Sequence, residues 1–225
     1  VMVMKKGFWI ILCMFFIPPV TFAGNMKLHY DRPAEYFEEA LVIGNGTMGA
    51  TLYGGVKKDK ISFNDITLWT GEPESENSSP DAFNTIPEIR ALLDNEDYQG
   101  ADKAQYKVQG HYSENYQPLG TLTIEYLDDT AGISDYHRWL DIGNATARTQ
   151  YLKDGKLFTS DYFASAPDSV IVIRLKSENK EGIHASLSFD SPLPHSSQVA
   201  DNEISVEGYA AYHSFPVYYK AEDKH

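Results

Sequence analysis

The regular alternation of apolar and polar residues in the second half of the chain is the feature that most constrains its fold. Leu122, Ile124 and Tyr126 alternate with threonine and glutamate, and a period of two indicates a strand with one buried face. Similar runs recur between turns without long helices between them, which is typical of an antiparallel β-sandwich. The strands that this pattern predicts are 50–56, 121–126, 157–164, 170–175 and 183–189.

The same pattern predicts which side chains form the core. Residues 170–175 are apolar on both faces except at Arg174, so we expect a central strand there. The dipeptide Asp154-Gly155 predicts a tight hairpin turn before the strand at 157–164. The predicted core residues are Leu122, Ile124, Val170, Ile171, Ile173, Leu175, Leu187 and Phe189.

Two short helical segments interrupt the strand pattern. The first covers 84–93, with Pro87 in its first turn and apolar side chains on one side. The second covers 98–108. We therefore predict a mainly β fold, an antiparallel twisted β-sandwich with a short two-helix insertion.

Residues 1–23 have the pattern of a signal peptide. Two lysines precede an apolar run over 7–17, and Ala23 supplies a small residue before the expected cleavage point. We therefore expect an exported protein, periplasmic or extracellular, whose mature N-terminal β-sandwich domain covers 24–225. No membrane association is expected after removal of the signal.

Charge and cysteine content limit the ligands and the chemistry. The chain has 32 acidic against 19 basic side chains, a net charge of −13, which disfavours nucleic acid and anionic membranes but not a neutral glycan. Its one cysteine, Cys13, lies in the predicted signal peptide, so the mature domain has no disulfide or thiol chemistry. The histidines lack the spacing of metal ligands. We expect no metal site and no cofactor.

A run rich in glycine, asparagine and apolar residues extends from Glu39 to Gly71. The spacing of Gly44, Gly46 and Gly49 within it matches a dinucleotide-binding fingerprint. That fingerprint must follow a strand and open a helix, whereas here a predicted strand comes after the glycines. Nucleotide binding is therefore not expected.

The end of this run contains the candidate substrate-binding residues. Asn64, Asp65, Thr67 and Trp69 place an amide, a carboxylate, a hydroxyl and an indole within six residues at a predicted strand end. An indole covers the apolar face of a sugar, while the polar groups bind its hydroxyls. The alternative is structural: Asn64 and Asp65 bond to their own turn, and Trp69 covers a core. The sequence leaves both interpretations open.

Motifs spread over most of the mature chain carry a family resemblance. They include Tyr30–Ala34, Gly44–Gly46, Met48–Ala50, Asn64–Trp69, Pro87–Arg90, Tyr116–Gly120 and Phe163–Asp168. In order and spacing, from about Met26 to Pro192, they resemble the N-terminal domain of glycoside hydrolase family 95. This family comprises exported α-L-fucosidases and relatives that act on α-L-galactosides. The chain departs from the family pattern at Ile66, where an acidic residue is usual.

The resemblance implies a partner and a mechanism. The family places a twisted β-supersandwich before a helical (α/α)6 barrel, so the expected partners are such a barrel in the same polypeptide and a glycan substrate. Its enzymes invert configuration with a glutamic acid and an activated water, and these groups belong to the barrel. The resemblance therefore implies no catalytic residue in this chain. Adjacent carboxylates such as Glu38-Glu39 and Asp128-Asp129 are expected to be solvated.

Other functions stay open on the sequence alone. A free-standing carbohydrate-binding or structural module would have the same aromatic strands and acidic surface. A disaccharide phosphorylase is another enzyme with a sandwich and a barrel. Several hundred residues of helical periodicity after His225 would favour the enzyme over the free-standing module.

Overall fold

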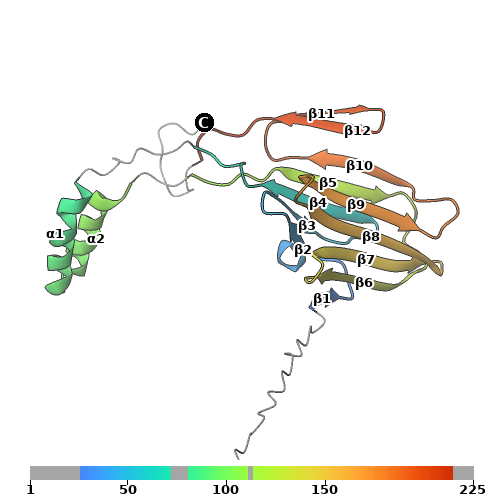
Figure 1. Ribbon diagram of the computed structural model, residues 1–225, viewed down its shortest axis with the longest axis horizontal. Coiled ribbons are helices and arrows are strands. Elements are labelled where there is room, and N and C mark those ends of the chain that lie inside the picture. Colours follow the sequence, from blue (N-terminus) through green and yellow to red (C-terminus); the bar gives the residue numbers. More distant parts are fainter. Residues whose placement is uncertain (1–25, 72–80, 111–113, 215–225) are drawn as a thin grey trace, which may run out of the picture.

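Two antiparallel sheets pack face to face in the computed structural model, which describes residues 26–71, 81–110 and 114–214 (Figure 1). The predicted signal peptide, 1–23, lies outside the described residues. Strands are the predominant regular structure of the described chain, and two short helices lie beside them. The predicted mainly β class with a two-helix insertion is confirmed.

The first sheet has the strand order β1-β6-β7-β8-β9, with every neighbouring pair antiparallel. Asp154 and Gly155 join β7 to β8, both with positive φ (51° and 75°), as a two-residue hairpin turn of type I′ requires. The predicted hairpin is thus confirmed. The strands are β1 (Lys27–Tyr30), β6 (Ile133–Asp141), β7 (Thr146–Lys153), β8 (Lys156–Ser165) and β9 (Val170–Ser177).

The second sheet has the order β10-β5-β4-β3-β2 and is also antiparallel throughout. Its strands are β2 (Leu41–Gly44), β3 (Met48–Leu52), β4 (Lys58–Asp65), β5 (Gly120–Tyr126) and β10 (Ala185–Asp190). A separate hairpin of β11 (His195–Ala200) and β12 (Glu203–Gly208) follows β10. A single 3₁₀ turn, η1 (Phe37–Glu39), precedes β2.

The predicted strands agree with the observed strands, apart from differences at the end of β3 and the start of β10. The strands predicted at 121–126, 157–164 and 170–175 lie within β5, β8 and β9, and the one at 183–189 corresponds to β10, which begins two residues later. The strand predicted at 50–56 is wrong in its last four residues, because β3 ends at Leu52.

The chain turns sharply after Leu52 because two glycines permit it. Gly54 has φ of 69°, in the left-handed region. A Cβ on Gly55 would lie 1.9 Å from the Lys58 carbonyl oxygen, so only glycine fits so close to the start of β4. The two glycines therefore end β3 and return the chain into β4.

The core lies between the two sheets. Leu52, Ile61 and Ile124 are almost fully buried and come from neighbouring strands of the second sheet. Tyr162 of β8 is buried against them, and Tyr126 of β5 also belongs to this cluster. Large aromatic side chains thus fill much of the space between the layers.

Most of the predicted core residues lie in this cluster or pack against it: Leu122, Ile124, Ile171, Ile173 and Leu175. Phe189 is half-buried and stacks on Phe63, with 6.5 Å between ring centroids. Val170 and Leu187 are not core residues, since they are 43% and 51% exposed. Val170 begins β9, an edge strand of the first sheet, and Leu187 lies on β10, an edge strand of the second. Val170 lies on the outer face of β9, because Ile171, Ile173 and Leu175 occupy its inward face. Leu187 faces inward opposite Ile124, but on an edge strand the opposite sheet covers it least.

A carboxyl group, Asp59, is buried in the core although the sequence pattern did not predict it. The side chain of Asp59 is 1% exposed. The Tyr162 hydroxyl donates to its Oδ2 at 2.6 Å, and the Gly55 N–H donates to its Oδ1 at 3.0 Å. Burial raises the pKa of Asp59 to about 6, and these hydrogen bonds limit the rise. Asp59 therefore links the two sheets and the Gly55 turn.

Arg138 is a second buried charged side chain. Its Nε donates to the Arg32 carbonyl at 2.8 Å and its Nη1 to the Glu39 carbonyl at 2.9 Å. The guanidinium lies 4.1 Å from the Tyr30 ring centroid, in range for a cation–π contact. This one side chain on β6 fixes the irregular segment that leads from β1 to β2.

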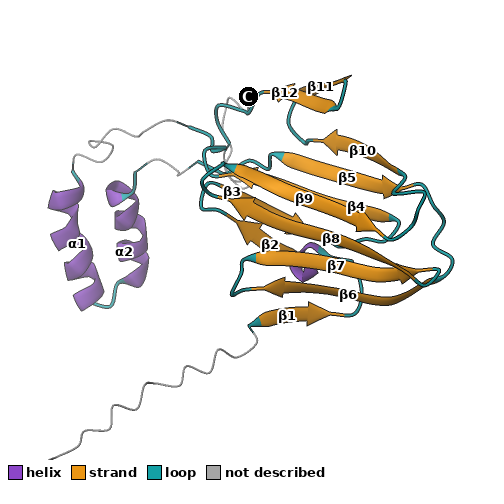
Figure 2. Ribbon diagram, turned by 45° about the vertical axis from the view of Figure 1, so that its right-hand side comes forward, coloured by secondary structure: helices purple, strands orange, loops and turns teal. Residues whose placement is uncertain are grey.

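The helical insertion stands beside the sheets (Figure 2). Helix α1 (Ala82–Asp94) and helix α2 (Tyr98–Gln105) pack on each other, and a 3₁₀ turn, η2 (Tyr106–Val108), follows. The predicted segments at 84–93 and 98–108 are confirmed, the last three residues as 3₁₀ rather than α-helix.

Candidate functional site

Asp65 and Thr67 form a local turn at the end of β4. The Asp65 Oδ1 accepts hydrogen bonds from the Thr67 N–H at 2.8 Å and from its hydroxyl at 2.6 Å. These bonds lower the pKa of Asp65. The Ile66 N–H also donates to the Thr47 carbonyl at 2.8 Å, which fixes the turn against the β2–β3 connection. Asp65 therefore bonds within its own turn, as the structural interpretation of this segment predicts.

Trp69 lies at the surface beside an aromatic residue from beyond the insertion. It forms an isolated antiparallel bridge with Tyr116. Directly opposed residues of such a bridge project to the same side. The two side chains are 55% and 61% exposed. Trp69 therefore does not cover a core in the described chain, and the two aromatic side chains lie on one surface.

A compact hydrogen-bond network holds this aromatic pair in place. The Thr70 hydroxyl donates to Glu114 Oε2 at 2.8 Å, and the Asn115 N–H donates to the same hydroxyl at 3.0 Å. The Ser214 N–H donates to Glu114 Oε2 at 2.8 Å, and this bond, with that from His213, lowers the pKa of Glu114. The stem of the helical insertion is thus bound to the segment after β12.

A groove on the outer face of the second sheet begins at Tyr116 and contains Asn64. It encloses about 370 Å³, within the size range of small-molecule sites. Phe37 of η1, Val42 of β2 and Pro118 supply apolar surface, and the rest of its wall comes from β3 and β4. This groove is called the outer-face groove below.

Two polar oxygens at this groove have no hydrogen-bond partner among the described residues. They are Thr51 Oγ1 on β3 and Asn64 Oδ1 on β4, and both are buried from solvent. The neighbouring hydroxyl of Ser62, by contrast, pairs with Thr121 Oγ1 at 3.0 Å. An unpaired buried oxygen costs about 1–3 kcal/mol, so each of these atoms has an unused capacity to accept a hydrogen bond.

The groove has the chemistry of a binding site rather than a catalytic one. No carboxylate, amine, imidazole or thiol is among the described side chains that line it. Of the four predicted site residues, the structure places Asn64 in the groove and Trp69 at its end beside Tyr116. Asp65 and Thr67 bond to each other instead. Thr51 and Tyr116 were not predicted as site residues, because only strand pairing brings Thr51 near Asn64 and Tyr116 beside Trp69.

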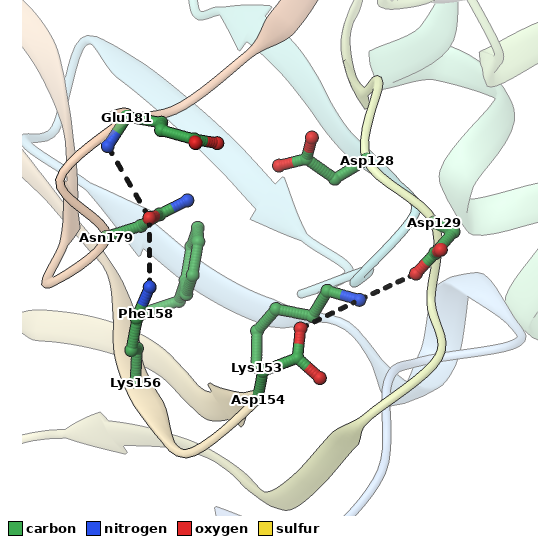
Figure 3. A pocket seen from close by; sticks show the side chains of 8 residues that line it. All are labelled: Asp128, Asp129, Lys153, Asp154, Lys156, Phe158, Asn179 and Glu181. Carbon is green, nitrogen blue, oxygen red and sulfur yellow. Dashed lines mark hydrogen bonds and ion pairs between the residues drawn. The ribbon is translucent and has the colours of Figure 1, made fainter.

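A second, smaller pocket lies between the β7–β8 hairpin and the loops after β5 and β9 (Figure 3). It encloses about 230 Å³ and is strongly polar. Three of its charged side chains pair with one another: Lys153 Nζ lies 2.6 Å from Asp129 Oδ1 and 3.5 Å from Asp154 Oδ2. The Lys156 Nζ donates to Asn179 Oδ1 at 3.2 Å. These pairings stabilise the hairpin and adjoining loops.

The adjacent carboxylates of the sequence are not paired acids. Glu39 is mostly covered and binds the Arg32 guanidinium, so it is not simply solvated as expected. Asp129 pairs with Lys153 at the surface. Within the described ranges no group of three potential metal ligands occurs, and none of the helices there is long and apolar enough to cross a membrane.

Comparisons with known proteins agree with the fold. The model of the family "Glycosyl hydrolase family 65, N-terminal domain" matches residues 28–222. The chain is 32% identical over 187 residues to alpha-L-fucosidase 2 of Arabidopsis thaliana, covering 81% of this chain and 22% of that protein. It is 28% identical over 179 residues to the probable alpha-fucosidase A of Aspergillus niger, covering 75% and 22%.

The chain spans about a fifth of the length of the curated relatives it matches, which are therefore longer proteins with further domains. The match to the probable alpha-fucosidase A of Aspergillus oryzae is 28% over 145 residues, with 62% of this chain and 20% of that protein covered. The chain belongs to the family of glycosyl hydrolase family 65 N-terminal domains, and it is homologous to the N-terminal part of α-L-fucosidases.

Proposed function

We propose that this chain is the N-terminal β-sandwich domain of an exported, inverting α-L-fucosidase-like glycoside hydrolase that acts on fucosylated or α-L-galactosylated glycans. The observation that carries the proposal is the 32% identity to a plant α-L-fucosidase across most of this chain. Export is supported by the lysines and apolar run of residues 1–23. The net charge of −13 accords with a neutral substrate.

The reaction itself belongs, in this proposal, to a helical barrel in the same polypeptide. Inversion needs an acid and a base about 6.5–9.5 Å apart, with water between them. Glu39 and Asp129 are bound by Arg32 and Lys153, and Asp65 forms a local turn, so these three carboxylates are not free for such a pair. The domain alone is then inactive, and its role is to support and complete the site of its partner.

The segment Asn64–Trp69 is proposed to face that barrel and to form one wall of its sugar site. The exposure of Trp69 and Tyr116 supports this role, because an exposed indole beside a phenol offers a flat apolar surface for a sugar. The network around Glu114 keeps the pair in place. Rigid support of this kind favours a binding surface.

Enzyme kinetics test whether Trp69 forms a wall of the sugar site. They are measured on the full natural polypeptide that contains this domain. Trp69→Ala should lower kcat/KM for a fucosylated glycan by at least tenfold while shifting Tm by less than about 2 °C, since an exposed side chain contributes little to folding. Tyr98→Ala, at an equally exposed aromatic residue of α2, should leave both values unchanged. If the two variants had equal effects, or if activity were lost only in step with unfolding, Trp69 would not form a wall of the sugar site.

A second candidate function is a free-standing carbohydrate-binding module. The outer-face groove favours it, because the groove offers binding chemistry without acid or base groups. The two functions differ in one measurement: only the first predicts that the full natural polypeptide hydrolyses an aryl α-L-fucoside.

A further inference from the structure

We propose that the outer-face groove binds one ring of a neutral pyranose, with Thr51 and Asn64 accepting hydrogen bonds from its hydroxyls. The choice of a sugar as ligand rests on the proposed function. The site itself rests on the shape, polarity and unpaired oxygens of the groove.

The shape of the groove suits a ring with an apolar face. Its volume of about 370 Å³ accommodates one small ring. The side chains of Phe37 and Tyr116 are both largely exposed at the groove, and aromatic surfaces of this kind bind the C–H faces of sugars. Gly49 has no side chain, which leaves the floor open between β2 and β4.

The polar groups of the groove are placed on one face of two paired strands. Thr51 is opposite Ser62 and Gly49 is opposite Asn64, so Thr51 and Asn64 are diagonal neighbours on the outer face. Such neighbours are about 7–8 Å apart, a spacing that one sugar ring with its hydroxyls bridges. Both oxygens are buried in the structure, so the proposal requires each side chain to change rotamer when the sugar binds.

The unpaired oxygens indicate a missing hydrogen-bond donor. Native proteins leave few buried polar atoms without a partner, and here two such atoms lie at one groove. Both are acceptors, and sugar hydroxyls donate readily to such oxygens.

Charge decides which class of polar ligand fits. The groove contains neither a cationic side chain to bind an anion nor a carboxylate to bind a cation. The surrounding protein has a net charge of −13, which repels anions. A neutral, hydroxyl-rich ring with an apolar face satisfies all of these conditions.

The test is a calorimetric titration of L-fucose into the full natural polypeptide, which counts sites and gives a Kd for each. Gly49→Val should remove one site, because the new side chain fills the floor. A Cβ there meets only the Ile43 carbonyl oxygen, at 3.4 Å, so the fold tolerates it. Thr51→Val should weaken the same site about five- to tenfold, the loss of one hydrogen bond, without lowering Tm. Thr123→Val, on the same outer face but outside the groove, is the matched control and should change nothing.

Two results would overturn the proposal. The first is an unchanged number of sites and unchanged Kd in both Gly49→Val and Thr51→Val. The second is a lower Tm of both variants with unchanged sugar binding, which would assign the groove to a contact with the rest of the polypeptide. Hydrolysis of an aryl α-L-fucoside, measured in parallel, separates the two proposals. Hydrolysis without groove-dependent binding rejects only the groove, and groove-dependent binding without hydrolysis rejects only the enzymatic function.

Discussion

The buried carboxyl group of Asp59 should make part of the stability of this domain depend on pH in an unusual direction. Burial between the sheets raises the pKa of Asp59 to about 6, from 3.8 for an ordinary aspartate. The folded protein therefore holds the proton more tightly than the unfolded chain. The associated stability is fully present below pH 4 and is lost as the pH rises from about 4 to about 6. At 1.36 kcal/mol per pKa unit, the loss is about 3 kcal/mol.

The assay compares the wild type with Asp59→Asn by urea unfolding at pH 4, 5, 6 and 7. A comparison is needed because carboxylates with lowered pKa, such as Glu114, still add stability at the acidic end of this range. Asparagine stays neutral, so the stability of Asp59→Asn relative to wild type should rise by about 2 kcal/mol from pH 4 to pH 7. A difference that stays constant within about 0.5 kcal/mol would show that Asp59 is not buried as a shifted acid.

Asp161 supplies a control of opposite sign. Burial alone would raise the pKa of Asp161, but hydrogen bonds from Arg148 and Arg174 outweigh it and lower the pKa. Its stabilising effect is therefore present at neutral pH and is lost as the pH falls through the lowered pKa. The stability of Asp161→Asn relative to wild type should consequently fall, not rise, as the pH increases from the lowered pKa to about 4, so this control needs urea titrations below pH 4.

Three further variants test the fold. Ile61→Ala should cost about 2–5 kcal/mol of unfolding free energy, because Ile61 is completely buried. Val170→Ala should cost less than about 0.5 kcal/mol by the same urea titration, as a half-exposed edge residue does, and similar costs for both would contradict the core described above. Gly54→Ala should destabilise by about 1–3 kcal/mol, since φ is 69° and the new Cβ would lie 2.7 Å from Thr149 Oγ1 and Tyr136 Oη. An unchanged Tm would refute this view of the turn.

The sequence predicted the strands well because each strand is a local pattern. It could not predict how far one sheet covers the other. Leu187 faces inward opposite Ile124, as its period requires, but β10 is an edge strand and Leu187 stays half exposed. Asp59 shares the inward face of β4 with Ile61, yet a charge there is tolerated only because Tyr162, 103 residues away, donates to it.

The candidate site likewise has a local part that the sequence predicts and a nonlocal part that it does not. The turn of Asp65 and Thr67 follows from residues two apart, and turn chemistry alone suggested it. The position of Trp69 depends on Tyr116, which lies beyond the helical insertion. The groove combines η1 with three strands, and Thr51 becomes a neighbour of Asn64 only through the register of β3 and β4. Such nonlocal pairings have no signature in one sequence.

The central proposal is that this domain belongs to an inverting α-L-fucosidase, and the anomeric form of the first product tests it most directly. Proton NMR should follow an aryl α-L-fucoside mixed with the full natural polypeptide, and in parallel with residues 24–225 alone. The account predicts that β-L-fucose appears first with the full polypeptide, as inversion requires, and that residues 24–225 release no sugar. First appearance of α-L-fucose, turnover by residues 24–225 alone, or no hydrolysis by the full polypeptide would contradict the account.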